Sequence, residues 1–208
     1  YILSDKKVKW AKNLPVIKIE VIKKNIDFSR YDALIFTSKN AICSLDSYTH
    51  KWKTKPLYVI APETAKIASD LGGKLKFAGK EKHGNEFAAE LIPLLKNKKV
   101  LYIRGSKVVS NMVDILNSNN IVCDEEIVYQ TVCINFKKKI KLPKKSVIIF
   151  SSPSTIECFL KNAIWDPSYK AVSIGRTTEK FFPSYIKPTL SETASLDSCV
   201  KKAIELSR

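Results

Sequence analysis

The feature that most constrains the fold is an internal repeat. Residues 36–38 (FTS) match residues 150–152 (FSS), and residues 60–66 (IAPETAK) match residues 174–180 (IGRTTEK) at the same offset. Each match covers the end of an apolar run and the beginning of a helical pattern. Chance would seldom keep one offset through two such corners, so we expect two related α/β lobes.

Short apolar, β-branched runs that alternate with helical patterns predict parallel sheets covered by helices on both faces. The expected strands are residues 33–38, 56–61, 74–79, 99–105, 146–152 and 170–175. The last strand of the first copy, at 101–105, has no counterpart late in the chain, and its nearest relative is the N-terminal run 1–5. One lobe is therefore expected to be discontinuous in sequence.

The expected fold class is α/β, with two flavodoxin-like or Rossmann-like parallel-sheet lobes. The predicted boundaries are 1–15 plus 138–208 for the discontinuous lobe, 28–125 for the inserted lobe, and 16–27 and 126–137 for a two-stranded β-ladder that joins the lobes. A tether of this kind leaves the lobes free to move, so we expect a ligand cleft between them.

Basic residues outnumber acidic ones by 36 to 20, which gives a formal net charge of +16. Such a field attracts polyanions, whether nucleic acid, anionic lipid or a small polycarboxylate. The strong bias toward Lys is equally consistent with an AT-rich genome, and the run 137–145 is interpreted as a solvated linker. A dedicated nucleic-acid binder would use more Arg. No apolar run approaches the roughly 20 residues that cross a bilayer, so we expect no membrane span.

The cysteines and histidines limit the kinds of catalytic and metal-binding site that the chain can form. Five scattered cysteines without a C-x-x-C pair argue against a disulfide framework and a structural zinc site, and they indicate a reducing cytoplasm. The two histidines, His50 and His83, have no second ligand nearby in sequence, so metal catalysis is not expected. Signatures for dinucleotide, P-loop, hydrolase-elbow and zinc-protease chemistry are also absent. We therefore expect neither a cofactor nor a metal.

A small hydroxyl residue recurs where a predicted strand ends and a helix begins, which is the edge where open α/β sheets bind ligands. Free backbone N–H groups at a helix N-terminus suit anions. Ser and Thr are also good N-caps, and this alternative stays open at each position. Tyr102 and Tyr129 are interpreted as ordinary strand residues. The candidate substrate-binding residues are Thr37, Ser38, Thr64, Arg104, Gly105, Ser106, Ser152, Ser154, Gly175, Thr177 and Thr178.

These motifs carry a family resemblance. The segments YDALIFTSKNAI, PLYVIAPETAKIASDLG, GNEFAAEL, VLYIRGS, EEIVYQTV, VIIFSSPSTIECFL and AVSIGRTTEKF follow one another in the order of uroporphyrinogen-III synthases. The chain resembles this family from about residue 30 to its end. The resemblance also implies two α/β lobes joined by a β-ladder, with one lobe discontinuous, as the repeat predicts.

The resemblance implies a cofactor-free lyase of haem and porphyrin biosynthesis that converts hydroxymethylbilane, a linear tetrapyrrole, into uroporphyrinogen III. Acid-assisted loss of the ring A hydroxyl gives an azafulvene, ring D attacks through its substituted carbon, and the resulting spiro-pyrrolenine recloses with ring D inverted. The substrate is a polycarboxylate, which gives the positive charge a use. The expected protein is a cytoplasmic monomer that makes at most transient contact with hydroxymethylbilane synthase and binds neither nucleic acid nor membrane.

Residue by residue, the resemblance points to Thr64 and to Thr177 or Thr178 as threonines of the site, and we take Thr64 and Thr177 as candidate catalytic, positioning residues. A tyrosine that some members place after the S-P-S turn, to help the hydroxyl leave, falls at Cys158 here. The proton donor is therefore open. The alternatives to a synthase are a non-catalytic two-lobed protein that binds an anionic ligand and a nucleic-acid binder, which would show salt-dependent retention. A two-lobed glycosyltransferase would need longer lobes.

Overall fold

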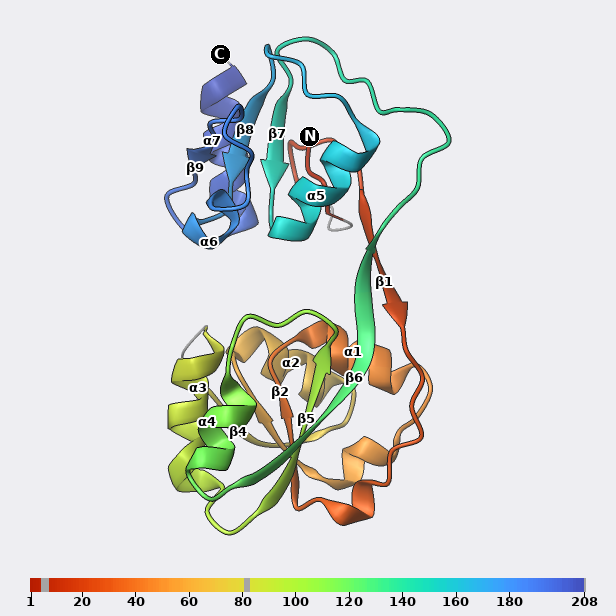
Figure 1. The fold of residues 1–208 in the computed structure, drawn as a ribbon, viewed down its shortest axis with the longest axis vertical. Helices are drawn as coiled ribbons and strands as arrows, with labels where there is room; N and C mark the ends of the chain where they lie inside the picture. The colour runs from red at the N-terminus through yellow and green to blue at the C-terminus, as the bar shows by residue number, and fades with distance from the viewer. Residues whose placement is uncertain (5–7, 81–82, 208) are drawn as a thin grey trace. The chain divides into compact units, whose positions relative to one another are not determined.

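The structure is a computed structural model that describes residues 1–4, 8–80 and 83–207. The chain divides into two compact units: unit 1 holds residues 1–18 and 132–208, and unit 2 holds residues 19–131 (Figure 1). Within the described ranges, no helix combines the length and the apolar character that crossing a membrane requires.

Unit 2 is built on a six-stranded sheet with the order β1-β6-β5-β2-β3-β4. From β2 to β6, neighbouring strands pair in parallel. Its strands are β1 (Ile17–Val21), β2 (Ala33–Phe36), β3 (Pro56–Val59), β4 (Lys74–Ala78), β5 (Lys99–Gly105) and β6 (Val122–Cys133). Its helices are α1 (Lys39–Asp46), α2 (Pro62–Asp70), α3 (Gly84–Leu91) and α4 (Met112–Ser118), with short 3-10 turns at Phe28–Arg30, Lys51–Thr54 and Ile92–Leu94.

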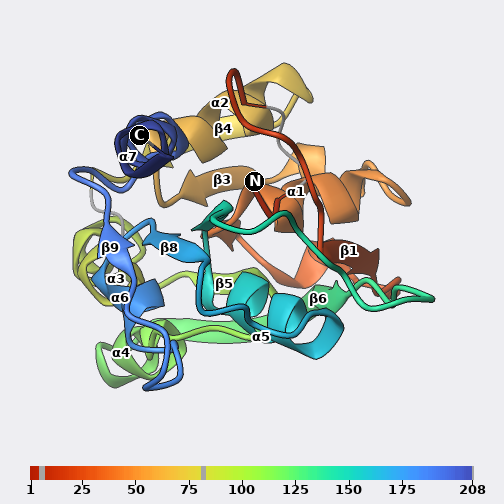
Figure 2. The same cartoon turned by 90° about the horizontal axis from the view of Figure 1, so that it is seen from above.

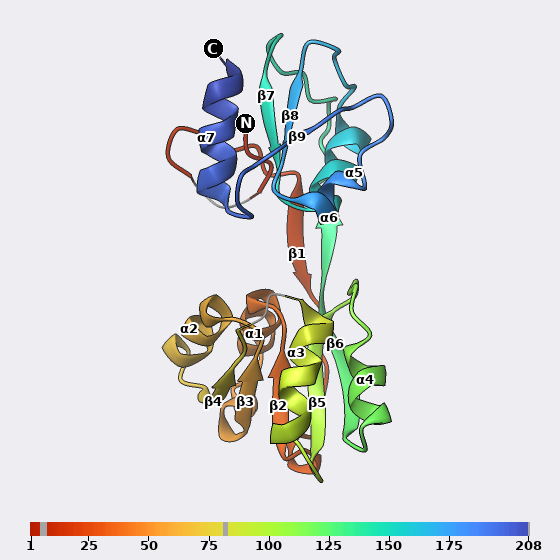
Figure 3. The ribbon, with the colours of Figure 1, turned by 90° about the vertical axis from the view of Figure 1, so that its left-hand side faces the viewer.

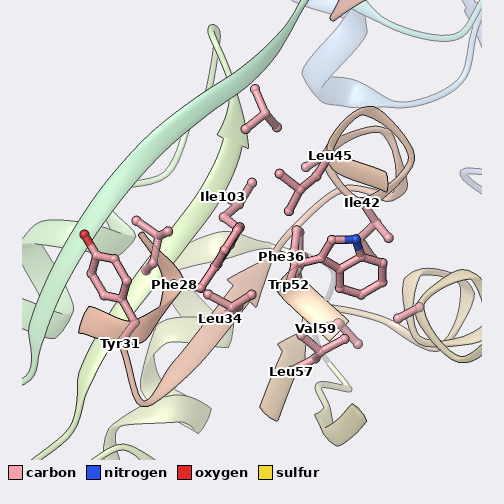
Figure 4. Close-up of a cluster of buried hydrophobic side chains, with 14 of the residues drawn as sticks. Phe28, Tyr31, Leu34, Phe36, Ile42, Leu45, Trp52, Leu57, Val59 and Ile103 are labelled. Atoms are coloured by element: carbon pink, nitrogen blue, oxygen red, sulfur yellow. The ribbon is translucent and has the colours of Figure 1, made fainter. Parts of the chain in front are cut away.

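The side chains of β2 point alternately to the two faces of this sheet, and a different pair of helices covers each face. Leu34 and Phe36 pack with residues of α1 and α2, whereas Ala33 and Ile35 pack with residues of α3 and α4 (Figure 2). Trp52 is fully buried in the α1–α2 layer, where its ring meets Phe36 edge-on at a centroid separation of 6.1 Å (Figure 4). Both faces of β2 are therefore covered, which is why this strand is a continuous apolar run.

Unit 1 repeats the plan with a smaller parallel sheet, β7-β8-β9. Residue Ile2 bridges in parallel to Ile149 on the free side of β7, so the N-terminal segment lies beside β7. The elements are β7 (Val147–Phe150), α5 (Pro153–Asn162), β8 (Lys170–Ser173), α6 (Arg176–Glu179), β9 (Thr189–Leu190) and α7 (Leu196–Ser207). Figure 3 shows α5 on one side of these strands and α7 on the other.

The parallel-sheet fold class and all six strands expected from the sequence are confirmed, with most strands ending one or two residues earlier than expected. The N-terminal run 1–5 is described only as far as Ser4, because Asp5 lies outside the described residues. Two bonds, Ile22 N to Val128 O (2.8 Å) and Ile134 N to Val16 O (2.9 Å), show that β1 and β6 run antiparallel.

The two segments that cross between the units do not form a separate two-stranded ribbon. Instead, β6 begins as a strand of the unit 2 sheet and continues beyond it. The run 137–145 is not a solvated linker throughout. Ile140 bridges to Ala163, and Leu142 also packs against the α5 side of unit 1. The exact lobe boundaries given above stay predictions.

The expectation that no disulfide forms is wrong. Cys133 at the end of β6 and Cys158 on α5 are joined by a disulfide, with Cα atoms 5.0 Å apart. The sequence argument failed because the two residues are separated by 25 positions and meet only when α5 packs beside the incoming chain. Cys43, Cys123 and Cys199 are free thiols.

Candidate active site

The strand order of unit 2 creates a switch point between β2 and β5. The chain leaves β2 toward β3 on one side, and it leaves β5 toward β6 on the other. At such a point, the helices that follow the two strands diverge, and ligands of open α/β sheets bind beyond the strand ends. The candidate residues Thr37, Ser38, Gly105 and Ser106 lie here, because they end or directly follow β2 and β5.

Two tyrosine hydroxyls reach the same edge. The Tyr102 hydroxyl lies 2.6 Å from Thr37 Oγ1, and the Tyr129 hydroxyl donates to Ser38 Oγ at 3.2 Å. Ser38 is also the N-cap of α1, since its Oγ accepts from the backbone N–H of Asn40 at 3.1 Å. Burial raises the pKa of Tyr102 above its usual value, so this hydroxyl stays protonated as a structural group.

The guanidinium group of Arg104 is paired with a carboxylate of β6. Its Nη2 and Nε atoms donate to the two oxygens of Glu125 at 2.6 and 2.8 Å, and its Nη1 donates to the Gly105 carbonyl at 2.9 Å. The hydrogen bond from Arg104 lowers the pKa of Glu125. A two-pronged pair of this kind fixes the guanidinium plane, so Arg104 braces the end of β5. Its predicted contact with substrate stays a prediction.

This pair gives a pH-dependent prediction. Because the folded pKa of Glu125 lies below its unfolded value of about 4.3, the pair stabilises the protein above that pH. The stabilisation is lost as pH falls through the folded pKa. Glu125→Gln should therefore cost about 0.2–1 kcal/mol at pH 7 and progressively less as pH falls through the folded pKa of Glu125. Urea midpoints of both proteins from pH 7 downward measure the effect, and a difference that grows as pH falls would contradict it.

The second corner of each unit lacks a side-chain cap. The helix α2 begins after Ala61, and α6 begins after Gly175, and neither residue carries a side chain that could accept a hydrogen bond. Thr64 and Thr178 occupy the same third position of these helices and are 6% and 4% exposed, whereas Thr177 is exposed. The backbone N–H groups of Glu63 and Thr64, in the first turn of α2, therefore remain available to an anion.

Unit 1 has its own switch point, between the N-terminal segment and β7. Ser152 caps α5 in a capping box with Thr155, and Ser154 is half-buried in the first turn of that helix. Ser4 lies beyond Ile2 on the neighbouring segment and is 7% exposed. Its Oγ finds no hydrogen-bond partner among the residues that the structure describes. A buried hydroxyl without a partner is costly, and a ligand can repair it.

Comparisons with known proteins decide the family. The family model for uroporphyrinogen-III synthase HemD matches residues 12–201. The chain belongs to the uroporphyrinogen-III synthase family. The uroporphyrinogen-III synthetase of Helicobacter pylori 26695 superposes with a TM-score of 0.86 at 28% identity, covering 99% of this chain and 97% of that one.

Two further proteins show how far the similarity in sequence and structure extends. The porphyrin biosynthesis protein HemD of Ruminiclostridium josui is 28% identical over 192 residues, which is 85% of this chain but 38% of that protein. The chain thus spans well under half the length of that relative. A mutant uroporphyrinogen III synthase from the extremely thermophilic bacterium Thermus thermophilus shares the fold at a TM-score of 0.55 and 12% identity, over 94% of this chain and 88% of that one.

The structure gathers the predicted site residues of this family member at the carboxyl edges of the two sheets, in two sets. Thr37, Ser38, Thr64, Arg104, Gly105 and Ser106 lie in unit 2, and Ser152, Ser154, Gly175, Thr177 and Thr178 lie in unit 1. Sequence reasoning left out Ser4 and took Tyr129 for an ordinary strand residue. Cys158, where the resemblance is expected to put a family tyrosine, is 3% exposed and bonded to Cys133, so it carries no proton to donate.

Proposed function

We propose that the chain is a uroporphyrinogen-III synthase in activity as well as in family, closing hydroxymethylbilane to uroporphyrinogen III with inversion of ring D and loss of water. The observation that carries the proposal is the repeated placement of hydroxyl side chains and an uncapped helix at the carboxyl edge of each sheet, in a chain of this family.

The reaction depends more on how the substrate is positioned than on a strong catalytic group. The substrate closes unaided without inversion, so the enzyme has to favour attack through the crowded ring carbon over attack through the free one. Holding a flexible reactant in one geometry can supply several kcal/mol of a barrier. Fixed hydroxyl and backbone donors at sheet edges suit this task, because their positions are set by the core.

The charge pattern supports a polycarboxylate substrate. The free N–H groups at the beginning of α2 and the dipole of this nine-residue helix favour carboxylates. The net charge of +16 adds long-range attraction. Screening acts over about 8 Å at physiological salt, so raised salt should raise the KM for hydroxymethylbilane.

The test generates hydroxymethylbilane enzymatically in the presence of this protein and separates the type I and type III isomers. An excess of type III over a control without the protein establishes the synthase. Type I alone, from protein shown to be folded by circular dichroism, would reject it and leave a two-lobed binding protein for an anionic ligand.

The two candidate threonines give a prediction. Thr64→Ala and Thr177→Ala should each slow type III formation by about tenfold, the size of a lost hydrogen bond to a charged group. Thr64→Ser, which keeps the hydroxyl, serves as the control and should recover most of the rate. Equal rates for Thr64→Ala and wild type would remove Thr64 from the site.

The same proposal places the protein in the cytoplasm as a monomer whose partner is its small-molecule substrate, with transient contact to hydroxymethylbilane synthase. The exposed free thiol of Cys43 suits a reducing compartment, whereas the Cys133–Cys158 disulfide is of a kind that is uncommon there. Nucleic acid and membrane are not among the proposed partners.

A further inference from the structure

We propose that unit 1 holds a second binding site, for a compact organic anion with an apolar body, at the edge of its sheet opposite to the candidate active site. The inference goes beyond the proposed function and does not depend on it. Three features carry it: a cavity, the bonds that hold the walls of the cavity in place, and the lysines that surround it.

The cavity lies at the amino edge of the unit 1 sheet. Its volume is about 400 Å³, which falls within the range of small-molecule sites. The lining comes from two segments, within residues 139–144 and 164–169, which precede β7 and β8. The candidate site residues of unit 1 follow the same two strands, so the cavity and the candidate active site lie at opposite edges of the sheet.

Hydrogen bonds fix the walls of the cavity. The Tyr169 hydroxyl accepts from the backbone N–H of Leu142 at 3.1 Å and donates to the Leu142 carbonyl at 2.9 Å, which ties the two lining segments together. The backbone N–H of Ile140 donates to the carbonyl of Asn162, at the end of α5, at 2.8 Å. The cavity is therefore formed before a ligand arrives, and binding needs little ordering of the protein.

The lining is rich in apolar and aromatic side chains. The ring of Trp165 meets the ring of Tyr169 edge-on at a centroid separation of 5.5 Å, and it meets Phe159 edge-on at 6.4 Å. Trp165 is half-buried, so part of its surface remains open. The neighbouring Ile164 is 79% exposed. An apolar ligand body that covers these two side chains removes their surface from water, which favours binding.

The charged side chains of the cavity favour an anion. Lys139, Lys141 and Lys144 line it, against the single carboxylate of Asp166. Asp166 already accepts from the backbone N–H of Ser168 at 2.8 Å, and Lys139 donates to a backbone carbonyl of α5 at 2.8 Å. Within the described ranges, no group accepts a hydrogen bond from the ammonium of Lys141 or Lys144. These two ammonium groups are therefore available to a carboxylate or a sulfonate.

The expected ligand differs from hydroxymethylbilane. The proposed substrate carries many carboxylates, whereas two available ammonium groups beside an apolar lining fit one or two negative charges at one end of an apolar body. An aryl carboxylate and an acyl-chain carboxylate share this chemistry. The aromatic side chains of the lining favour the aryl carboxylate, because aromatic rings pack well against one another.

The experiment titrates the full chain with 2-naphthoate, decanoate and uncharged 2-naphthalenemethanol by isothermal calorimetry at physiological salt. We expect one molecule of 2-naphthoate per chain, and binding of the uncharged analogue that is weaker by about tenfold because it cannot pair with the lysines. Tighter binding of 2-naphthoate than of decanoate assigns the cavity to aromatic anions, and the reverse order assigns it to acyl chains. Failure of both anions to bind, or equal binding of the uncharged analogue, would overturn the inference.

Charge-reversed variants locate the site. Lys141→Glu combined with Lys144→Glu should weaken 2-naphthoate binding by about tenfold or more. The matched control, Lys137→Glu combined with Lys138→Glu, makes the same change in net charge at exposed positions of the same run that do not line the cavity. This control should keep the wild-type affinity. All four side chains are exposed, so both variants should keep the wild-type melting temperature. An equal loss in the two variants would assign binding to the overall charge of the protein and overturn the inference.

Discussion

Gly105→Ala is expected to lower the rate of type III formation by about 100-fold. The added methyl group would lie 2.6 Å from Tyr129 Cζ, so either the ring or the end of β5 has to move. A shift of about 1 Å in a positioned group can cost about 100-fold in rate. Overpacking of this kind should also lower the free energy of unfolding by about 1–3 kcal/mol.

The cause can be isolated with Tyr129→Ala, because this change removes the ring that the methyl group meets. Gly105→Ala should destabilise the wild-type protein but scarcely the Tyr129→Ala protein. Denaturant unfolding and the isomer assay measure the two effects separately. Wild-type activity in Gly105→Ala would show that the edge tolerates movement and would contradict the site as described.

The repeat predicted most of the fold because it is a local signal. Apolar runs show where strands lie, and the repeated corners at residues 36–38 and 150–152 show where they end. The carboxyl edge of a parallel sheet then follows, since strand ends of one direction meet there. For this reason the candidate residues lie at sheet edges as expected, although their contact with substrate stays a prediction.

The roles of individual side chains depend on register and could not be found this way. Nothing in the amino-acid sequence around Tyr129 indicates a bulge, because the bulge exists only in the pairing of β6 with β5. The same holds for Arg104, whose partner Glu125 is 21 residues away. Ser38 and Ser152 proved to be N-caps, the alternative left open for them, while the corners after Ala61 and Gly175 have no such cap.

Cys158→Ala is expected to lower the free energy of unfolding by about 3 kcal/mol in the absence of reductant, with little effect on type III formation. The disulfide closes a loop across 25 positions, and a cross-link of that span restricts the unfolded chain by about this amount. Activity should persist because Cys158 is 3% exposed and packs within the core on the α5 side.

The matched control is Cys199→Ala, which removes a fully buried sulfur that is a free thiol. It reports the cost of lost packing alone, and the excess loss in Cys158→Ala is the contribution of the disulfide. Reductant should destabilise wild type to nearly the level of Cys158→Ala and leave that variant unchanged. If reductant leaves wild type unchanged, Cys133 and Cys158 are unpaired in solution, and a large loss of activity in Cys158→Ala would give position 158 a direct part in the reaction. Both outcomes bear on the proton donor, which the sequence leaves open, because a free thiol at position 158 would still carry a proton.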